Sequence, residues 1–168
     1  ASMLHNALRL PSDSILFMGV SEIGDLLVEV KSEAFIDLPM EGINFDALRR
    51  WDGYDRGVII CSLTTPAEPP ESDSASVDKE EKAAVDFWSR FFAPKAGINE
   101  DPVTGSAHCV LAPYFCHKLN KSTVLGQQRS ARGGIVECTL IPGTGEGNND
   151  LVRLTGRTTT TMKGSLLL

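Results

Sequence analysis

Residues 104–119 read TGSAHCVLAPYFCHKL, and this stretch predicts a helix that is apolar on nearly every side. A helix without a polar face is typical of a buried element, so we expect it inside the core. Thr104-Gly105-Ser106 opens the helix, and Asn120 fits the position after its end because Asn tolerates the left-handed conformation. Pro113 lies inside the helix, where a proline removes a backbone hydrogen bond and favours a bend.

Strands are predicted on both sides of this helix in the sequence. Aliphatic and aromatic residues gather in segments that turn residues separate. We expect strands at residues 14–20, 26–31, 57–63, 87–92, 135–141, 151–156 and 157–168. The first two form a hairpin through Gly24-Asp25, and the continuous apolar run at 57–63 indicates burial on both faces. Short helices are expected at 3–10 and 45–51, the second capped by Asn44, with loops at 93–103 and 142–150.

The composition excludes several classes of protein. The chain has 168 residues, of which 42% are apolar and 23% charged, which is enough for one domain with a hydrophobic core. The formal net charge of −6 argues against nucleic-acid binding, which needs basic surface. The sequence has no run of 18 apolar residues and begins without signal-peptide features, so we expect a cytoplasmic chain with no membrane partner.

The cysteines are expected to be free thiols. Each of them lies in an apolar stretch, and none has the spacing of a structural zinc site. We therefore predict four buried thiols, at Cys61, Cys109, Cys116 and Cys138, and no metal.

Residues 64–82 change character, because prolines, serines and acidic residues replace apolar ones. This composition predicts a mobile, solvated acidic loop. Docking of a partner on the loop is a weaker alternative, since charged runs usually face water.

The opening of the apolar helix is the segment suited to chemistry. The first backbone amides of a helix have no acceptor within it, and the helix dipole is positive there. Gly105 allows close approach of a ligand and Ser106 adds a hydroxyl, so this end predicts a carboxylate or phosphate site. Asp101 lies five residues before Ser106, and an acid beside a bound anion is suited to proton transfer. Alternatively, Asp101 or Thr104 simply caps the helix.

Two other features could contribute to the same site. Residues 128–134 read QRSARGG and could supply Arg132 or backbone amides to the anion, although most such turns only connect strands. His108 falls on the first helical turn, where it could carry a proton, although a lone histidine in an apolar helix is more often a core residue.

Two quoted stretches together resemble a known family. Residues 91–109 read FFAPKAGINEDPVTGSAHC, and with QRSARGG at 128–134 they are similar to the signature of PhzF-like, phenazine biosynthesis-like proteins. The resemblance implies an α+β, diaminopimelate-epimerase-like fold with a mostly antiparallel sheet wrapped around a central buried helix at about 105–119. It also implies isomerisation or epimerisation of a small carboxylate substrate by proton transfer, without a cofactor.

The resemblance also assigns roles to residues. It implies that Asp101 and Ser106 are catalytic, and that Gly105 and Ala107 hold the substrate carboxylate through their backbone. We add further candidates for substrate binding: Thr104, His108, Arg132 and Gly133.

The family has two lobes, and the motifs of the first lobe are not found in this sequence. We expect residues 1–13 to form the inter-lobe segment and the start of a lobe, and residues 14–168 the C-terminal lobe. The missing N-terminal lobe or a homodimer partner would then complete the active site, and the isolated chain would be inactive. The alternative is a non-catalytic module that binds an anion or associates with itself.

Overall fold

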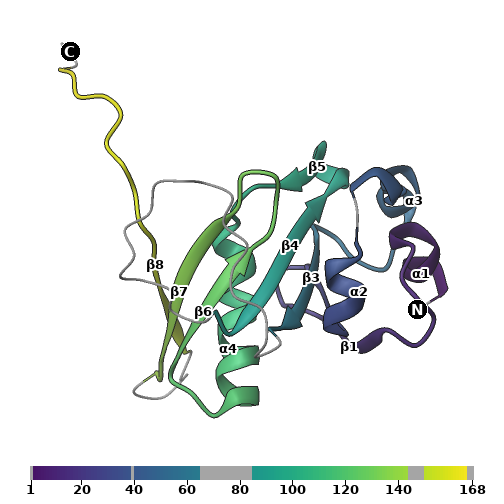
Figure 1. Ribbon diagram of the computed structural model, residues 1–168, viewed down its shortest axis with the longest axis horizontal. Coiled ribbons are helices and arrows are strands. Elements are labelled where there is room, and N and C mark those ends of the chain that lie inside the picture. The colour runs from purple at the N-terminus through teal and green to yellow at the C-terminus, as the bar shows by residue number, and fades with distance from the viewer. Residues whose placement is uncertain (1, 39, 65–84, 144–149, 166–168) are drawn as a thin grey trace.

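One mixed sheet of eight strands carries the fold, with helices against both of its faces (Figure 1). The computed structural model describes residues 2–38, 40–64, 85–143 and 150–165. In chain order the elements are α1 (Ser2–Leu8), β1 (Ile15–Val20), β2 (Leu26–Val30), α2 (Ser32–Ile36), η1 (Met40–Gly42), α3 (Phe45–Arg50), β3 (Val58–Leu63), β4 (Phe87–Ala93), η2 (Pro94–Ala96), β5 (Ile98–Asp101), α4 (Gly105–Leu119), β6 (Thr123–Gln128), β7 (Gly134–Ile141) and β8 (Leu151–Thr155).

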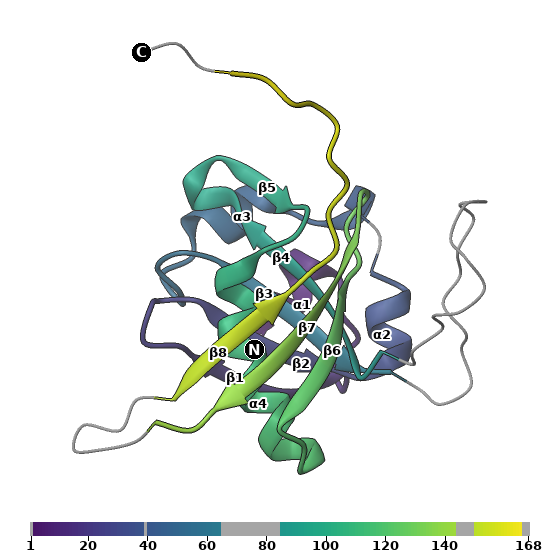
Figure 2. The ribbon, with the colours of Figure 1, turned by 90° about the vertical axis from the view of Figure 1, so that its left-hand side faces the viewer.

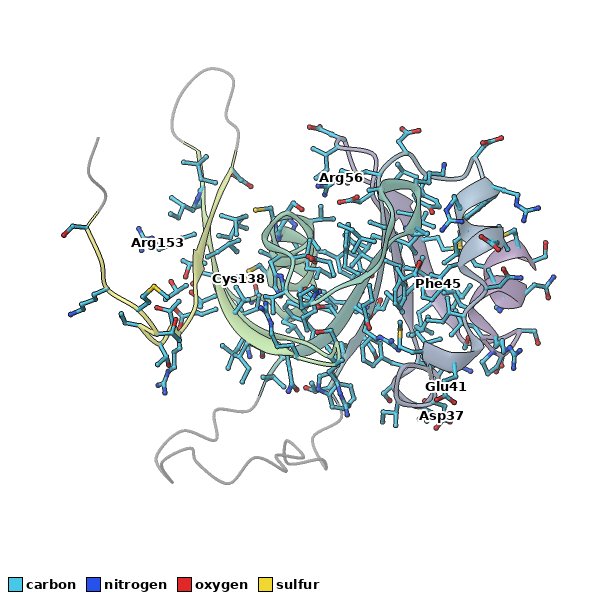
Figure 3. All side chains as sticks on the ribbon, turned by 90° about the horizontal axis from the view of Figure 1, so that it is seen from above. Asp37, Glu41, Phe45, Arg56, Cys138 and Arg153 are labelled. Atoms are coloured by element: carbon cyan, nitrogen blue, oxygen red, sulfur yellow. The ribbon has the colours of Figure 1, made fainter. Side chains whose placement is uncertain are left out.

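The strands follow the order β1-β2-β3-β4-β6-β7-β8, and β5 pairs with β4 outside this path. All neighbouring pairs are antiparallel except β2 with β3 and β4 with β6. This confirms the predicted α+β class with a mostly antiparallel sheet. Seen from above, the sheet curls around α4 (Figure 3).

The sheet has a hydrophobic cluster on each face because side chains alternate along its strands. On β4, Phe87 and Phe91 point into the cluster that contains α4. Trp88 and Phe92 point into the opposite cluster, which includes residues of α1, α2 and α3. This explains why the sequence of β3 reads as a continuous apolar run and why aromatic residues of β4 are buried on both faces of the sheet.

Several local predictions are confirmed. The β1–β2 hairpin forms, with Gly24 in the left-handed region at φ +82°. The side chain of Asn44 accepts a hydrogen bond from the Ala47 amide and caps α3. Asn120 adopts the left-handed conformation at the end of α4. The paired strands β7 and β8 flank the predicted turn, but most of that turn, like the acidic loop expected at 64–82, lies outside the described residues.

Two segments differ from the sequence prediction. The loop expected at 93–103 contains the short helix η2 and strand β5, because residues 98–101 pair with the part of the β4 edge that β6 leaves unpaired. The strand expected at 157–168 is wrong for the described residues, since 156–165 form no regular structure. That segment extends away from the sheet and has no neighbouring strand with which to pair (Figure 2).

Helix α4 is less buried than predicted. Leu111, Ala112 and Phe115 lie in the core, but Cys109 is exposed. The expectation of four buried thiols is therefore wrong for Cys109 and confirmed for the other three. The physical reason is that the sheet order ends at β1 and β8, which do not pair with each other. One side of the helix is consequently left uncovered. Among the described residues, no helix is long and apolar enough to cross a membrane.

Candidate functional site

The backbone amides that begin α4 are not capped by a side chain. Thr104 occupies the N-cap position with extended dihedral angles, but its side chain makes no capping hydrogen bond. The first hydrogen bond of the helix runs from the His108 amide to the Thr104 carbonyl oxygen, over 3.2 Å. Within the described ranges, the amides of Gly105, Ser106 and Ala107 have no acceptor. Three donors are therefore available to a ligand at the positive end of the helix dipole.

Asp101 and Thr104 bond to each other instead of capping the helix. The Thr104 hydroxyl donates to Asp101 Oδ2, and the Asp101 carboxylate is partly buried at the end of β5. The alternative that the side chain of Asp101 or Thr104 caps α4 is therefore wrong. This contact fixes one carboxylate oxygen and leaves Oδ1 without a hydrogen-bond partner in the described part of the chain.

Gln128 holds the loop that carries these two residues. Its buried side-chain amide donates to the Asp101 carbonyl over 2.6 Å and to the Thr104 hydroxyl over 3.1 Å. Its side-chain oxygen accepts from the Thr104 amide over 2.8 Å. In the sequence, Gln128 stands out only as the first residue of the 128–134 motif. Its burial at the end of β6 makes it the structural link between that strand and Asp101.

Arg56 also reaches the start of α4, although nothing in the sequence singled it out. Arg56 forms an ion pair with the buried Asp25, and its Nη2 donates to the Ser106 hydroxyl over 3.0 Å. Arg56 and Ser106 are 50 residues apart, so no local pattern could have linked them. Arg56 is labelled in Figure 3.

The polar turn between β6 and β7 lies beside the same loop. Ser130 donates to the Pro102 carbonyl over 2.7 Å and accepts from the Gly133 amide over 3.0 Å. Gly133 is left-handed at φ +68°, which favours glycine. The side chain of Arg132 is exposed and makes no hydrogen bond with any described residue. Ser130, rather than Arg132, is the residue that joins this turn to the predicted site.

His108 is fully buried in the core. Its Nδ1 lies 2.8 Å from the Thr104 carbonyl, and Nε2 has no partner among the described residues. The ring lies 6.2 Å from that of Phe87, centroid to centroid. Burial lowers the pKa of His108 below its ordinary value of 6.5, and the hydrogen bond to Thr104 opposes this shift only in part.

The lowered pKa of His108 predicts a loss of stability in mild acid. Below pH 6.5 the unfolded chain takes up a proton at this histidine more readily than the folded chain does, so acid favours unfolding. We expect the free energy of unfolding to fall by up to about 1.4 kcal/mol per pH unit in that window. Urea unfolding at pH 7.5 and pH 5.5 measures this decrease in the free energy of unfolding. The decrease should be smaller in His108→Gln than in the natural chain. An equal fall in both proteins would contradict the prediction.

A substitution at Gly105 can test anion binding without disturbing the fold. A Cβ built there lies 3.7 Å from its nearest neighbour, Leu154, so alanine fits without a clash. Since alanine also favours a helix, Gly105→Ala should leave thermal unfolding unchanged or raise its midpoint. We expect the same variant to weaken anion binding, because the added methyl group lies where a ligand would approach the amides. Calorimetric titration with acetate measures this, and unchanged affinity would argue against close approach.

Among the described residues, no group of three or more His, Cys, Asp or Glu side chains is arranged to hold a metal ion.

The chain is similar to a known family and its solved structures. The profile of the family described as phenazine biosynthesis-like protein matches residues 67–164. An uncharacterised isomerase of Halalkalibacterium halodurans is 39% identical over 144 residues, which cover 86% of this chain and 44% of that protein. A PhzF-family structure from Enterococcus faecalis superposes with a TM-score of 0.65 at 30% identity, covering 93% of this chain and 48% of that one.

A second structure supports the same likeness. A putative PhzC/PhzF protein from Clostridium difficile gives a TM-score of 0.59 at 26% identity, over 96% of this chain and 51% of that one. The chain therefore spans about half the length of the relatives it matches.

Proposed function

Because the chain belongs to the phenazine biosynthesis-like family, an isomerase-type family with the diaminopimelate-epimerase-like fold, we propose that it forms part of a cofactor-independent isomerase or epimerase. The substrate is a small metabolite that carries a carboxylate, and the reaction moves a carbon-bound proton. Residues 14–168 act as the C-terminal lobe, and residues 1–13 as the connection to it and its first helix.

The observation that carries this proposal is the uncapped start of α4. The free amides of Gly105, Ser106 and Ala107 can bind a carboxylate and stabilise the negative charge that develops on it when a neighbouring carbon loses its proton. A capping side chain in the same place would have occupied these donors. Substrate binding by Arg132, Gly133 and His108 has less support, because Arg132 is exposed and His108 is buried in the core.

Asp101 is the proposed proton-transfer group. Thr104 and Gln128 fix its carboxylate and its backbone beside the start of the helix, and Oδ1 remains available to take or give a proton. Ser106, on the first turn of α4, is proposed to donate a hydrogen bond to the substrate. Epimerisation, which inverts a carbon centre, needs a second acid or base on the opposite face of the substrate. We propose that a further lobe or a partner copy supplies it.

Solvent-deuterium exchange tests this function. The full-length natural protein is incubated in D₂O with a panel of small amino acids and unsaturated carboxylic acids, and mass spectrometry detects a gain of deuterium at carbon. We expect at least one acid to exchange, and Ser106→Ala to slow that exchange. If no acid exchanges, or if Ser106→Ala exchanges at the natural rate, the proposal is wrong.

The exposed face of α4 favours a second candidate function, a self-associating module. Cys109 is exposed, Val110 and Pro113 on the same side of α4 are partly exposed, and an uncovered apolar helix face promotes association. Light scattering of the 168-residue chain across a range of concentrations measures it. Dimers that do not catalyse exchange would favour the module, whereas a monomer at every concentration would exclude self-association.

A further inference from the structure

The side chain of Arg56 is anchored by a buried acid. Its Nε donates to Asp25 Oδ1 over 2.9 Å and its Nη2 donates to Asp25 Oδ2, while the Asp25 side chain is 0% exposed. The Arg56 amide also donates to the Gly24 carbonyl, over 3.0 Å. A buried carboxylate is stable only when it is paired, so Asp25 holds the guanidinium in one place. The guanidinium carbon lies 5.8 Å from the centre of the Phe91 ring, which further limits its movement.

The contact with Ser106 has a defined direction. Nη2 of Arg56 lies 3.0 Å from Ser106 Oγ, and a guanidinium has donors but no acceptor. A hydroxyl has one proton and two lone pairs, so Ser106 accepts at this contact and its own proton points elsewhere. Among the described residues, the Ser106 hydroxyl has no other hydrogen-bond partner. Its proton therefore remains available to a ligand.

The direction is set by the guanidinium itself, because it has N–H donors and no acceptor. Asp25 balances the charge of Arg56, so the pair affects Ser106 through orientation more than through net charge. A serine that acts as a base or a nucleophile needs a neighbour that takes its proton. Arg56 is a permanent donor and cannot do so.

We propose that Arg56 is the positioning residue for Ser106, and that it fixes the Ser106 hydroxyl as a hydrogen-bond donor to the substrate carboxylate. This inference rests on the proposed function and adds to it a role for Ser106 and a residue that sets this role. Arg56 acts through Ser106, so replacing it should matter only while the hydroxyl is present.

A double-mutant cycle on the 168-residue chain tests this directly. Acetate is titrated into ¹⁵N-labelled protein, and the NMR signals of the Gly105, Ser106 and Ala107 amides report binding. We expect Ser106→Ala to weaken acetate binding by about ten-fold, and Arg56→Lys, which retains the charge without the forked geometry, by a similar factor. The double variant Arg56→Lys/Ser106→Ala should bind as weakly as Ser106→Ala alone.

The outcomes separate the two proposals. If Arg56→Lys weakens binding equally with and without Ser106, Arg56 contacts the anion itself and the positioning role is wrong. If the natural chain does not bind acetate at the Gly105, Ser106 and Ala107 amides, the carboxylate site of the proposed function is wrong. The donor role of Ser106 is then wrong as well. The ligand-free protein provides an independent readout, because the Arg56 Nη signals should exchange slowly with water and faster in Ser106→Ala. Fast exchange in the natural chain would overturn the Arg56 proposal alone.

A second variant controls for misfolding, which could result if Asp25 were left buried without a fitting partner. Should Arg56→Lys not give a folded spectrum, Arg56→Gln combined with Asp25→Asn removes both charges, so that no unpaired ion is buried. This variant keeps Ser106 but loses the guanidinium, and it should show the same weakened binding. Natural affinity in that variant would contradict the proposal.

Discussion

Replacing Asp101 by Asn in the full-length protein is expected to lower solvent-deuterium incorporation by about 10²–10⁴-fold, the usual contribution of a positioned acid or base. Asparagine has nearly the same shape and can still accept the hydrogen bond from Thr104, so the loop between β5 and α4 should be retained. It cannot take up or release a proton at the substrate carbon. The measurement is the rate of deuterium gain by whichever acid exchanges with the natural protein.

A matched control separates chemistry from charge. Asp13 is an exposed acid paired with Lys31, and Asp13→Asn removes the same charge away from α4. We expect this control to exchange deuterium at the natural rate. Equal rates for Asp101→Asn and Asp13→Asn would show that Asp101 does not transfer the proton. A loss in Asp101→Asn together with a lower unfolding midpoint would indicate a structural role instead.

Glu100 gives the largest expected effect on stability. Its carboxylate accepts from Arg90 Nε over 2.6 Å, and both side chains are 7% exposed. Arg90 also donates to the Leu38 carbonyl, and its guanidinium carbon lies 5.0 Å from the centre of the Phe92 ring. Glu100→Ala leaves this buried cation without its acid. We therefore expect the free energy of unfolding to fall by about 3–5 kcal/mol.

Urea unfolding measures the loss at Glu100, and two comparisons define its cause. Glu100→Gln should lose less, since the amide oxygen can still accept from Arg90. Asp46→Asn breaks the exposed ion pair with Arg49 and should cost less than about 1 kcal/mol. If Glu100→Ala were no more damaging than Asp46→Asn, the Arg90–Glu100 pair would not hold β5 against β4. Asp101 is the last residue of β5. A loosened strand should therefore also lower the rate at which the substrate acid gains deuterium at carbon.

The elements that the sequence predicted correctly depend on nearby residues. The β1–β2 hairpin needs a turn at Gly24-Asp25, and α3 needs the Asn44 side chain at its start. Each interaction spans a few positions, so alternation and capping patterns reveal it. Strand β5 was missed because residues 98–101 have little strand character and form a strand only where β4 offers a free edge.

The candidate site was predictable only in part, for the same reason. The sequence pointed to Asp101, Gly105 and Ser106 because they adjoin the start of an apolar helix. It marked Gln128 only as part of the 128–134 motif, without its contact with Thr104 across 24 residues, and it did not point to Arg56, whose contact with Ser106 spans 50. A buried glutamine and a paired arginine have ordinary local sequences. Their roles appear only once β3, β6 and α4 are packed together.

By itself, the sequence determined the apolar helix, its opening at Thr104-Gly105-Ser106 and the strands that read as buried, since these depend on the order of residues along the chain. The tertiary structure decided which side of α4 the sheet covers and which side chains reach its first turn. An apolar helix has no polar stripe to mark its exposed side, so burial is set by where the curling sheet stops. Likewise, Arg56 meets Ser106 across 50 residues of sequence, with its guanidinium paired to the buried Asp25.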